Sequence, residues 1–104
     1  MSMSIGMMWK MSYEIRLKKS VLKFIQSRNQ KEKNTIKIKF ALLEENPYPN
    51  NIKLDIKKLQ SSEFFRLRVN DYRFIYEIIE NELIIDIQKS GNRGEVYKWV
   101  MKEH

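Results

Sequence analysis

The chain has no cysteine, so a disulfide framework, a zinc–thiolate site and catalysis by a thiol are excluded. Its single histidine is the last residue, His104. A ribonuclease that uses paired histidines as acid and base is therefore excluded, and so is a histidine metal site. No apolar run approaches the roughly 18 residues of a membrane span, and the N-terminus lacks the layout of a signal peptide. We therefore expect a cytoplasmic protein.

Positive charge is what the chain has in excess. Lysine and arginine number 20 against 13 aspartates and glutamates, which gives a net charge of +7. This excess favours a polyanionic partner such as RNA, DNA or an acidic protein. The 104 residues suit one domain, and a hydrophobic fraction of 42% suffices for a small core. Residues 1–11 hold five of the six methionines without a usable period, so we interpret them as an extension and residues 12–104 as the domain.

The strongest pattern is a pair of strands around Asn70-Asp71. Residues 63–69 and 72–79 are rich in β-branched and aromatic side chains, and the two residues between them favour a tight turn. Because side chains alternate across a strand, one face of this hairpin is expected in the core. That face carries Leu67, Val69, Tyr72, Phe74, Tyr76 and Ile78.

The other face of the hairpin carries three arginines, Arg66, Arg68 and Arg73. In the expected register Arg68 lies directly opposite Arg73, and like charges in that position destabilise a sheet by up to about 1 kcal/mol. Neither arginine is placed for stability. We therefore hypothesise an anionic ligand over this face, with plain solvated arginines as the alternative.

Before the hairpin, the alternation of residues 13–17 predicts a short strand, and the apolar spacing within residues 18–28 predicts a helix. Residues 32–45 contain both a strand-like and a helix-like pattern. Their length favours a helix that ends before Pro47. Residues 52–59 predict an extended lead-in to the hairpin with a basic edge. The lysines of that edge are either ligands for an anion or charges that prevent edge pairing.

After the hairpin, Glu80-Asn81 predicts a second tight turn and residues 83–88 a third strand. Pairing back through that turn sets Ile85 opposite Tyr76, Ile87 opposite Phe74 and Gln88 opposite Arg73. The carboxylates Glu77 and Asp86 share the arginine face, where we expect them to be ion-pair partners of the arginines.

The third strand leaves the sheet at the end where the Asn70-Asp71 turn lies. Residues 90–94 predict a flexible loop, and residues 95–103 a short terminal helix or tail. Arg93 and Tyr97 are therefore expected to emerge beside Arg68 and Arg73. Cations from separate segments would then converge on one patch, which favours the anion-binding interpretation.

Together these residues resemble the RelE/ParE toxin superfamily, and its RelE branch in particular, from Tyr13 to about Lys102. The most specific parts are the arginine-rich hairpin with Tyr72-Arg73, then Gly91-x-Arg93, then Val96-Tyr97. The resemblance implies an α+β fold of order β-α-α-β-β-β, as in microbial RNases. In that fold a two-helix hairpin packs on a mainly antiparallel four-stranded sheet, followed by a short C-terminal helix.

The same resemblance implies the toxin of a type II toxin–antitoxin system, a ribosome-dependent endoribonuclease that cleaves mRNA in the A site by 2′-hydroxyl attack. It implies no metal or organic cofactor. The implied partners are mRNA, ribosomal RNA and an acidic RelB-like antitoxin in a hetero-oligomer, with no membrane. Carried over residue by residue, the catalytic positions are Arg66, Arg68, Arg73, Arg93 and Tyr97, and the RNA-binding positions are Lys57, Lys58 and Lys98.

One departure concerns the general base. Some RelE-type toxins carry lysines at the positions of Arg66 and Arg68, and arginine stays protonated. We expect both arginines to act electrostatically, which leaves proton removal to Tyr97, a nearby carboxylate or ribosomal RNA. A ParE-like inhibitor of DNA gyrase on the same fold is the alternative function. A non-toxic relative that binds an acidic partner is a third.

Overall fold

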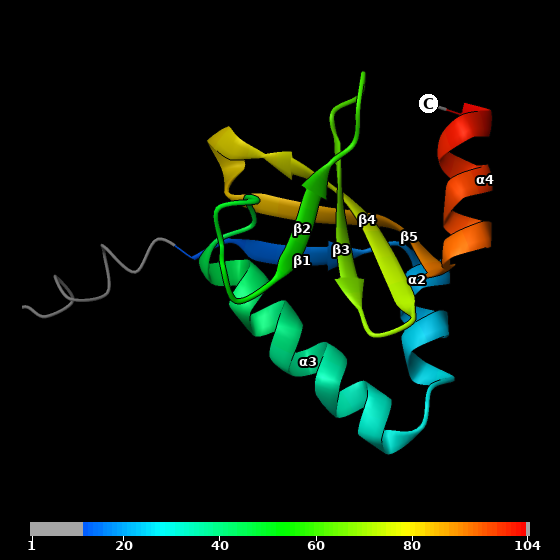
Figure 1. Ribbon diagram of the computed structural model, residues 1–104. Coiled ribbons are helices and arrows are strands. Elements are labelled where there is room, and N and C mark those ends of the chain that lie inside the picture. The colour runs from blue at the N-terminus through cyan, green and yellow to red at the C-terminus, as the bar shows by residue number, and fades with distance from the viewer. Residues whose placement is uncertain (1–11, 104) are drawn as a thin grey trace, which may run out of the picture.

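The computed structural model describes residues 12–103 (Figure 1). The proposed extension, residues 1–11, and His104 lie outside the described residues. No described helix combines the length and the apolar character needed to cross a membrane. In chain order the elements are β1 (Glu14–Leu17), α2 (Lys19–Gln26), α3 (Gln30–Glu45), β2 (Asp55–Lys58), β3 (Phe64–Val69), β4 (Tyr72–Ile79), the 3₁₀ turn η1 (Glu80–Glu82), β5 (Ile84–Asn92) and α4 (Arg93–Glu103).

The described strands form one sheet in the order β1-β5-β4-β3-β2, with β1 parallel to β5 and the other neighbours antiparallel. This confirms the predicted fold class, but the sheet has five strands where four were expected. The additional strand is β2, which the sequence indicated only as an extended lead-in. Its Lys57 pairs in register with Arg66 of β3. A lysine-rich segment this short carries no local signal that separates a paired strand from a free one.

The central hairpin has the predicted register. Arg68 pairs with Arg73 and Leu67 pairs with Phe74. Asn70, the first residue of the turn, has a φ of 54°, a left-handed conformation that asparagine tolerates better than most residues. The turn chemistry and the alternation of the flanking strands therefore determine this part of the fold locally.

The predicted pairing of the third strand is wrong by two residues at Tyr76 and by three residues at Arg73. Tyr76 pairs with Ile87 rather than with Ile85, and Arg73 pairs with Gly91 rather than with Gln88. The expected two-residue turn is instead η1 followed by Leu83 at a φ of 54°. A bulge then interrupts the register beside Tyr76.

The helical hairpin α2–α3 covers the core face of the sheet. The ambiguous segment is helical, as favoured, and Asn29 caps it by accepting a hydrogen bond from the backbone N–H of Glu32 at 2.8 Å. Val21, Ile36 and Leu43 from these helices are buried against the sheet residues Leu67, Phe74, Tyr76, Ile85 and Ile87.

The junction between β5 and α4 contains no loop, contrary to the prediction for residues 90–94. The strand ends at Asn92 and the helix begins at Arg93. The Asn92 side chain accepts from the Glu95 N–H at 3.0 Å, and the Glu95 carboxylate accepts from the Asn92 N–H at 3.2 Å. This reciprocal capping starts the helix at once. The capping pattern Asn92-x-x-Glu95 was the signal that the sequence reading missed.

Helix α4 lies on the arginine face of the sheet, opposite α2 and α3. It packs on β4 and β5, and its Trp99 ring lies 5.5 Å from the ring of Phe64, whose neighbour Phe65 faces the core. In Figure 1 the connection between β2 and β3 projects beyond the sheet on the side where α4 also extends. These two projections bound the surface that carries the arginines.

Candidate functional site

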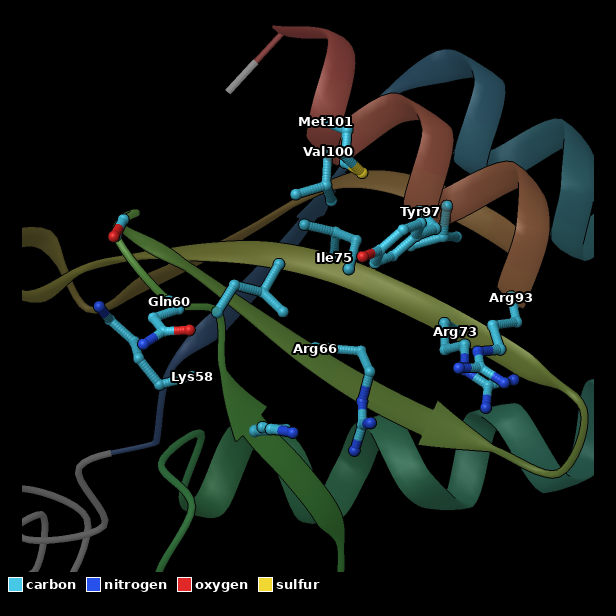
Figure 2. A pocket seen from close by; sticks show the side chains of 13 residues that line it. Lys58, Gln60, Arg66, Arg73, Ile75, Arg93, Tyr97, Val100 and Met101 are labelled. Atoms are coloured by element: carbon cyan, nitrogen blue, oxygen red, sulfur yellow. The ribbon is translucent and has the colours of Figure 1, made fainter.

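A cleft of about 970 Å³ lies on the arginine face, between α4 and the β2–β3 connection. Six of the residues that were predicted as site residues line it: Lys57, Lys58, Arg66, Arg73, Arg93 and Tyr97. Figure 2 shows Arg73 and Arg93 close together at one end of the cleft and Lys58 with Gln60 at the other. The cleft is therefore cationic along its length.

Strand alternation and helical spacing place these side chains. Arg66 of β3 and Arg73 of β4 project from the face opposite to the core residues beside them. Arg93 begins α4, and Tyr97 follows four residues later, so that both lie on the same side of the helix. Tyr97 is 63% exposed, and Figure 2 shows its ring beside Ile75, with both side chains in the lining of the cleft.

The arginines of the cleft act on one another electrostatically. Burial lowers the pKa of Arg73 below its usual value, and the positive charges of Arg68, Arg66 and Arg93 lower it further. Asp55 opposes this shift. Arginine remains protonated in proteins, so the shift signals crowded positive charge rather than a neutral side chain. An anion bound here would relieve that repulsion.

The carboxylate that pairs with these arginines is Asp55, not the expected Glu77 or Asp86. Arg66 Nη2 donates to Asp55 Oδ1 at 2.6 Å, whereas Asp86 accepts from Gln88 at 2.9 Å. The sequence reading missed Asp55 because it did not recognise β2 as a strand paired with β3. Within residues 12–103, Arg66 Nε is also a buried donor without an acceptor. Such unsatisfied donors are rare in native structures and call for an explanation.

Two predicted residues lie outside the cleft. Arg68 lines an adjoining smaller hollow, and its Nε donates to the carbonyl of Asn70 at 3.2 Å. It nonetheless contributes to the field at Arg73. Lys98 is exposed and does not line the cleft, because the face of α4 that does so carries its neighbour Tyr97.

The β2–β3 connection contributes residues that the sequence reading did not single out. Leu59, Gln60 and Ser61 line the cleft, and Ser61 has a φ of 61°. Lys58 Nζ donates to the carbonyl of Ser62 at 2.5 Å, which ties the lysine to this wall. The Ser61-Ser62 pair is a turn signal that could have indicated a connection of defined shape.

The arrangement suits the binding of a phosphodiester. Arginine presents a planar fork that matches two phosphate oxygens, and a phenol can stack on a base or form a hydrogen bond. Within residues 12–103, no three acidic, histidine or cysteine side chains gather closely enough to hold a metal ion.

Comparison with known proteins agrees with this geometry. Residues 15–97 match the family described as ParE toxin of type II toxin-antitoxin system, parDE. The chain is 32% identical over 89 residues to the protein named "Putative toxin RelE1" of Methanocaldococcus jannaschii, which covers 85% of this chain and 98% of that protein.

Solved structures show the same fold. The archaeal RelE–RelB complex from Pyrococcus horikoshii OT3 superposes with a TM-score of 0.69 at 29% identity, over 80% of this chain and 97% of that chain. The isolated toxin RelE of E. coli superposes with a TM-score of 0.66 at 20% identity, over 88% of this chain and 97% of that chain, which supports the fold alone. The family match covers most of the chain, and the match to the sequence relative covers 85% of it. The chain therefore belongs to the RelE/ParE family of toxins of type II toxin–antitoxin systems.

Proposed function

We propose that this toxin is an endoribonuclease that cleaves mRNA in the ribosomal A site. The observation that carries the proposal is the convergence of Arg66, Arg73 and Arg93 with Tyr97 in one cleft. An RNA strand supplies the nucleophile for its own cleavage, its 2′-hydroxyl. The protein therefore needs to align the strand, stabilise negative charge and assist the transfer of a proton.

In the proposed reaction the 2′-oxygen bonds to the adjacent phosphorus and the bond from phosphorus to the 5′-oxygen breaks. The products are a 2′,3′-cyclic phosphate and a 5′-hydroxyl. The phosphorane between them carries two negative charges, and arginine forks held in place before the reaction stabilise it. Arg73 is the best placed for this role, since it is already surrounded by three other arginines.

The 2′-hydroxyl must lose its proton, and the arginines cannot accept it. Among the described residues that line the cleft none is a carboxylate, and Asp55 lines the adjoining hollow while paired with Arg66. These positions disfavour a carboxylate base. We therefore assign proton removal to Tyr97 or to a group of the ribosomal RNA. The same group, once protonated, can return the proton to the 5′-oxygen as its bond to phosphorus breaks.

The test uses the variants Arg73→Ala and Arg93→Ala on ribosomes programmed with a defined A-site codon. We expect each to lower the cleavage rate by about 100-fold or more, as for the loss of one preorganised donor to a developing charge. Arg16→Ala is the matched control, because Arg16 is an exposed arginine of β1, away from the cleft. Full cleavage by both cleft variants, with normal circular dichroism, would remove the active-site assignment.

We also propose an acidic, RelB-like antitoxin as the partner, in a hetero-oligomer. The similar structures from Pyrococcus horikoshii and Methanococcus jannaschii are complexes of RelE with RelB. The net charge of +7 favours an acidic chain, and exposed apolar residues such as Ile38 and Met101 offer it contacts. We propose that an antitoxin helix takes over the surface that α4 covers. Unchanged hydrogen exchange in α4 on antitoxin binding would contradict this displacement.

Inhibition of DNA gyrase remains the second candidate, since the matching family is described by its ParE toxin. Expression in cells separates the two functions. A nuclease stops translation and leaves cut mRNA, whereas a gyrase inhibitor induces a DNA-damage response. Arg73, Arg93 and Tyr97 in one cleft favour the nuclease, because contact with a gyrase surface does not require phosphate-binding arginines around a phenol.

A further inference from the structure

A second hollow, of about 440 Å³, adjoins the cleft on the outer side of β2. Three cations from three segments line it: Lys39 of α3, Lys53 of the loop before β2, and Arg68 near the end of β3. Sequence reasoning placed Arg68 with the cleft arginines, included Lys53 in the basic edge of residues 52–59, and gave no role to Lys39. The structure places the three cations around one depression.

The charge of this hollow is not neutralised within the described part of the chain. No carboxylate of residues 12–103 forms an ion pair with Lys39, Lys53 or Arg68. Asp55 also lines the hollow, but its Oδ1 is already paired with Arg66 at 2.6 Å. A second anion bound here would therefore contact three cations, because the one carboxylate of the hollow is already paired with Arg66.

One cross-strand pair of residues links the lining of the hollow with the lining of the cleft. Arg68 and Arg73 are direct cross-strand partners, so their β-carbons lie about 5 Å apart. Arg73 lines the cleft and Arg68 lines the hollow. A polyanion that leaves the cleft at Arg73 therefore meets Arg68 next, and the two lysines beyond it.

We propose that the hollow binds the continuation of the RNA strand whose scissile linkage lies in the cleft, through its phosphodiester backbone at Arg68, Lys39 and Lys53. This inference rests on the proposed nuclease function. The side chain of Ile52 is 95% exposed at the rim, where it offers an apolar surface to an unstacked base.

The hollow fits an RNA backbone better than a helix of an acidic protein. A docked helix needs a row of apolar contacts at successive turns. The hollow offers the exposed Ile52 and the largely buried Leu54, while its other lining residues are charged or polar. In an RNA strand phosphates alternate with bases. The phosphates can therefore contact the three dispersed cations, while a base contacts the exposed apolar side chain.

The test measures binding of two RNA oligonucleotides whose 2′-O-methyl groups prevent cleavage. One spans about 4 nucleotides and the other about 12, within the range of single-strand binding sites. The double variant Lys39→Ala/Lys53→Ala should bind the short RNA like the wild type. For the long RNA we expect at least tenfold weaker binding at low salt. The slope of log K against log salt should also fall by about 1.4, or roughly 0.7 for each lost phosphate contact.

The control is Lys31→Ala/Lys37→Ala, which removes the same charge from exposed positions of α3, the helix that carries Lys39, outside both depressions. It should leave the affinity ratio of the two RNAs unchanged. Circular dichroism checks that both variants fold.

Three results would overturn the inference. The first is an unchanged affinity ratio in the Lys39/Lys53 variant. The second is a loss of cleavage on ribosomes with oligonucleotide binding intact, which would assign the hollow to a separate RNA. The third is weakened antitoxin binding alone. In each case the wild type still cleaves mRNA, whereas a wild type that neither cleaves mRNA nor binds the short RNA would contradict the proposed function itself.

Discussion

At the scale of single residues, Arg73 is the position at which the positive charges of the site act together. It is partly buried beside three other arginines. The carboxylate of Asp55 partly offsets their positive charge at Arg73, but it is hydrogen-bonded to Arg66. Direct pairing of Arg68 with Arg73 disfavours the sheet by up to about 1 kcal/mol. A fold that needed only stability would gain from a neutral residue here. The cost is consistent with selection for binding an anion.

The shape of the Arg73 side chain should matter as much as its charge. Arg73→Lys keeps the positive charge but loses the planar fork, so one of two parallel hydrogen bonds to a phosphate is lost. We expect mRNA cleavage on programmed ribosomes to slow by at least about tenfold, the effect of roughly 1.4 kcal/mol in the transition state. The salt dependence of RNA binding should hardly change. Equal rates for lysine and arginine would show that only charge is needed at this position.

At the scale of elements, two asparagines define where helices begin. Asn29 caps α3 and Asn92 caps α4, each through its side-chain oxygen. The first cap fixes the helix that covers the core, and the second turns the chain directly from β5 into the wall of the cleft. The elements that carry the site are thus oriented by local hydrogen bonds as well as by packing.

Removal of the α3 cap should lower stability without touching the cleft. Asn29→Ala leaves the N–H of Glu32 without its side-chain acceptor, which typically costs about 1 kcal/mol. Urea unfolding followed by circular dichroism measures the loss. Asn29→Gly is the control and should cost only a few tenths of a kcal/mol. Similar losses for alanine and glycine would argue against the cap as the cause.

Another contact between elements makes stability depend on pH. Tyr48 and Tyr13 donate hydrogen bonds to the two carboxylate oxygens of Glu80, and these bonds hold the pKa of Glu80 below its usual value of 4.5. Because the folded pKa is the lower one, the stabilisation is present above pH 4.5 and is lost as the pH falls through the folded value.

The variant Glu80→Gln tests this contact. We expect it to unfold at a lower urea concentration than the wild type at pH 7, and the two midpoints to converge as the pH falls from 4.5 through the lower pKa of Glu80 in the folded protein. Denaturation series at several pH values give the comparison. A constant difference between the proteins across this range would rule out ionisation of Glu80 as its origin.

At the scale of the whole molecule, the net charge of +7 accompanies a surface with two cationic depressions on neighbouring strands. Such a surface attracts polyanions over distances of about one Debye length, so association with them is fast at low salt. The same field suits both proposed partners, RNA and an acidic antitoxin. Competition between them for the cationic face would be a direct means of control.

Binding of the proposed antitoxin should therefore respond to salt mainly in its association rate. We expect the rate constant to fall about tenfold or more between 20 mM and 500 mM sodium chloride, while the dissociation rate changes less. Stopped-flow mixing of purified toxin and antitoxin measures both. An association rate that is independent of salt would show that apolar contacts, rather than this charge, direct the encounter.

The sequence predicted those parts of the molecule whose determinants are local. The hairpin register follows from Asn70 and the alternation on both sides of it. The convergence of Arg73 with Arg93 follows from the antiparallel return of β5 to the turn end of this hairpin. The sequence did not predict the exact pairing of β5, because this pairing depends on Leu83 in a left-handed conformation and on a bulge near Tyr76. Neither the left-handed residue nor the bulge is marked by a distinctive sequence pattern.

Within the site, Asp55 and the second hollow were missed for a related reason. Both depend on β2, whose pairing with β3 is a contact between segments rather than a pattern within one. Lys98 is a different case, since this lysine is next to Tyr97 in sequence but does not line the cleft, and its predicted contact with RNA stays a prediction. Sequence proximity is a poor guide on a helix, where neighbours diverge by about 100°.

The parallel pairing of β1 with β5 has a consequence for how the toxin is made. Glu14 of β1 finds its partner only when Ile84 of β5 has been synthesised, and Arg93 follows β5 directly. While the chain is still being translated, the first strand is unpaired and the cationic cleft has no second wall. A nascent or prematurely terminated chain that ends before α4 therefore lacks Arg93 and Tyr97, two of the residues on which the proposed nuclease activity depends.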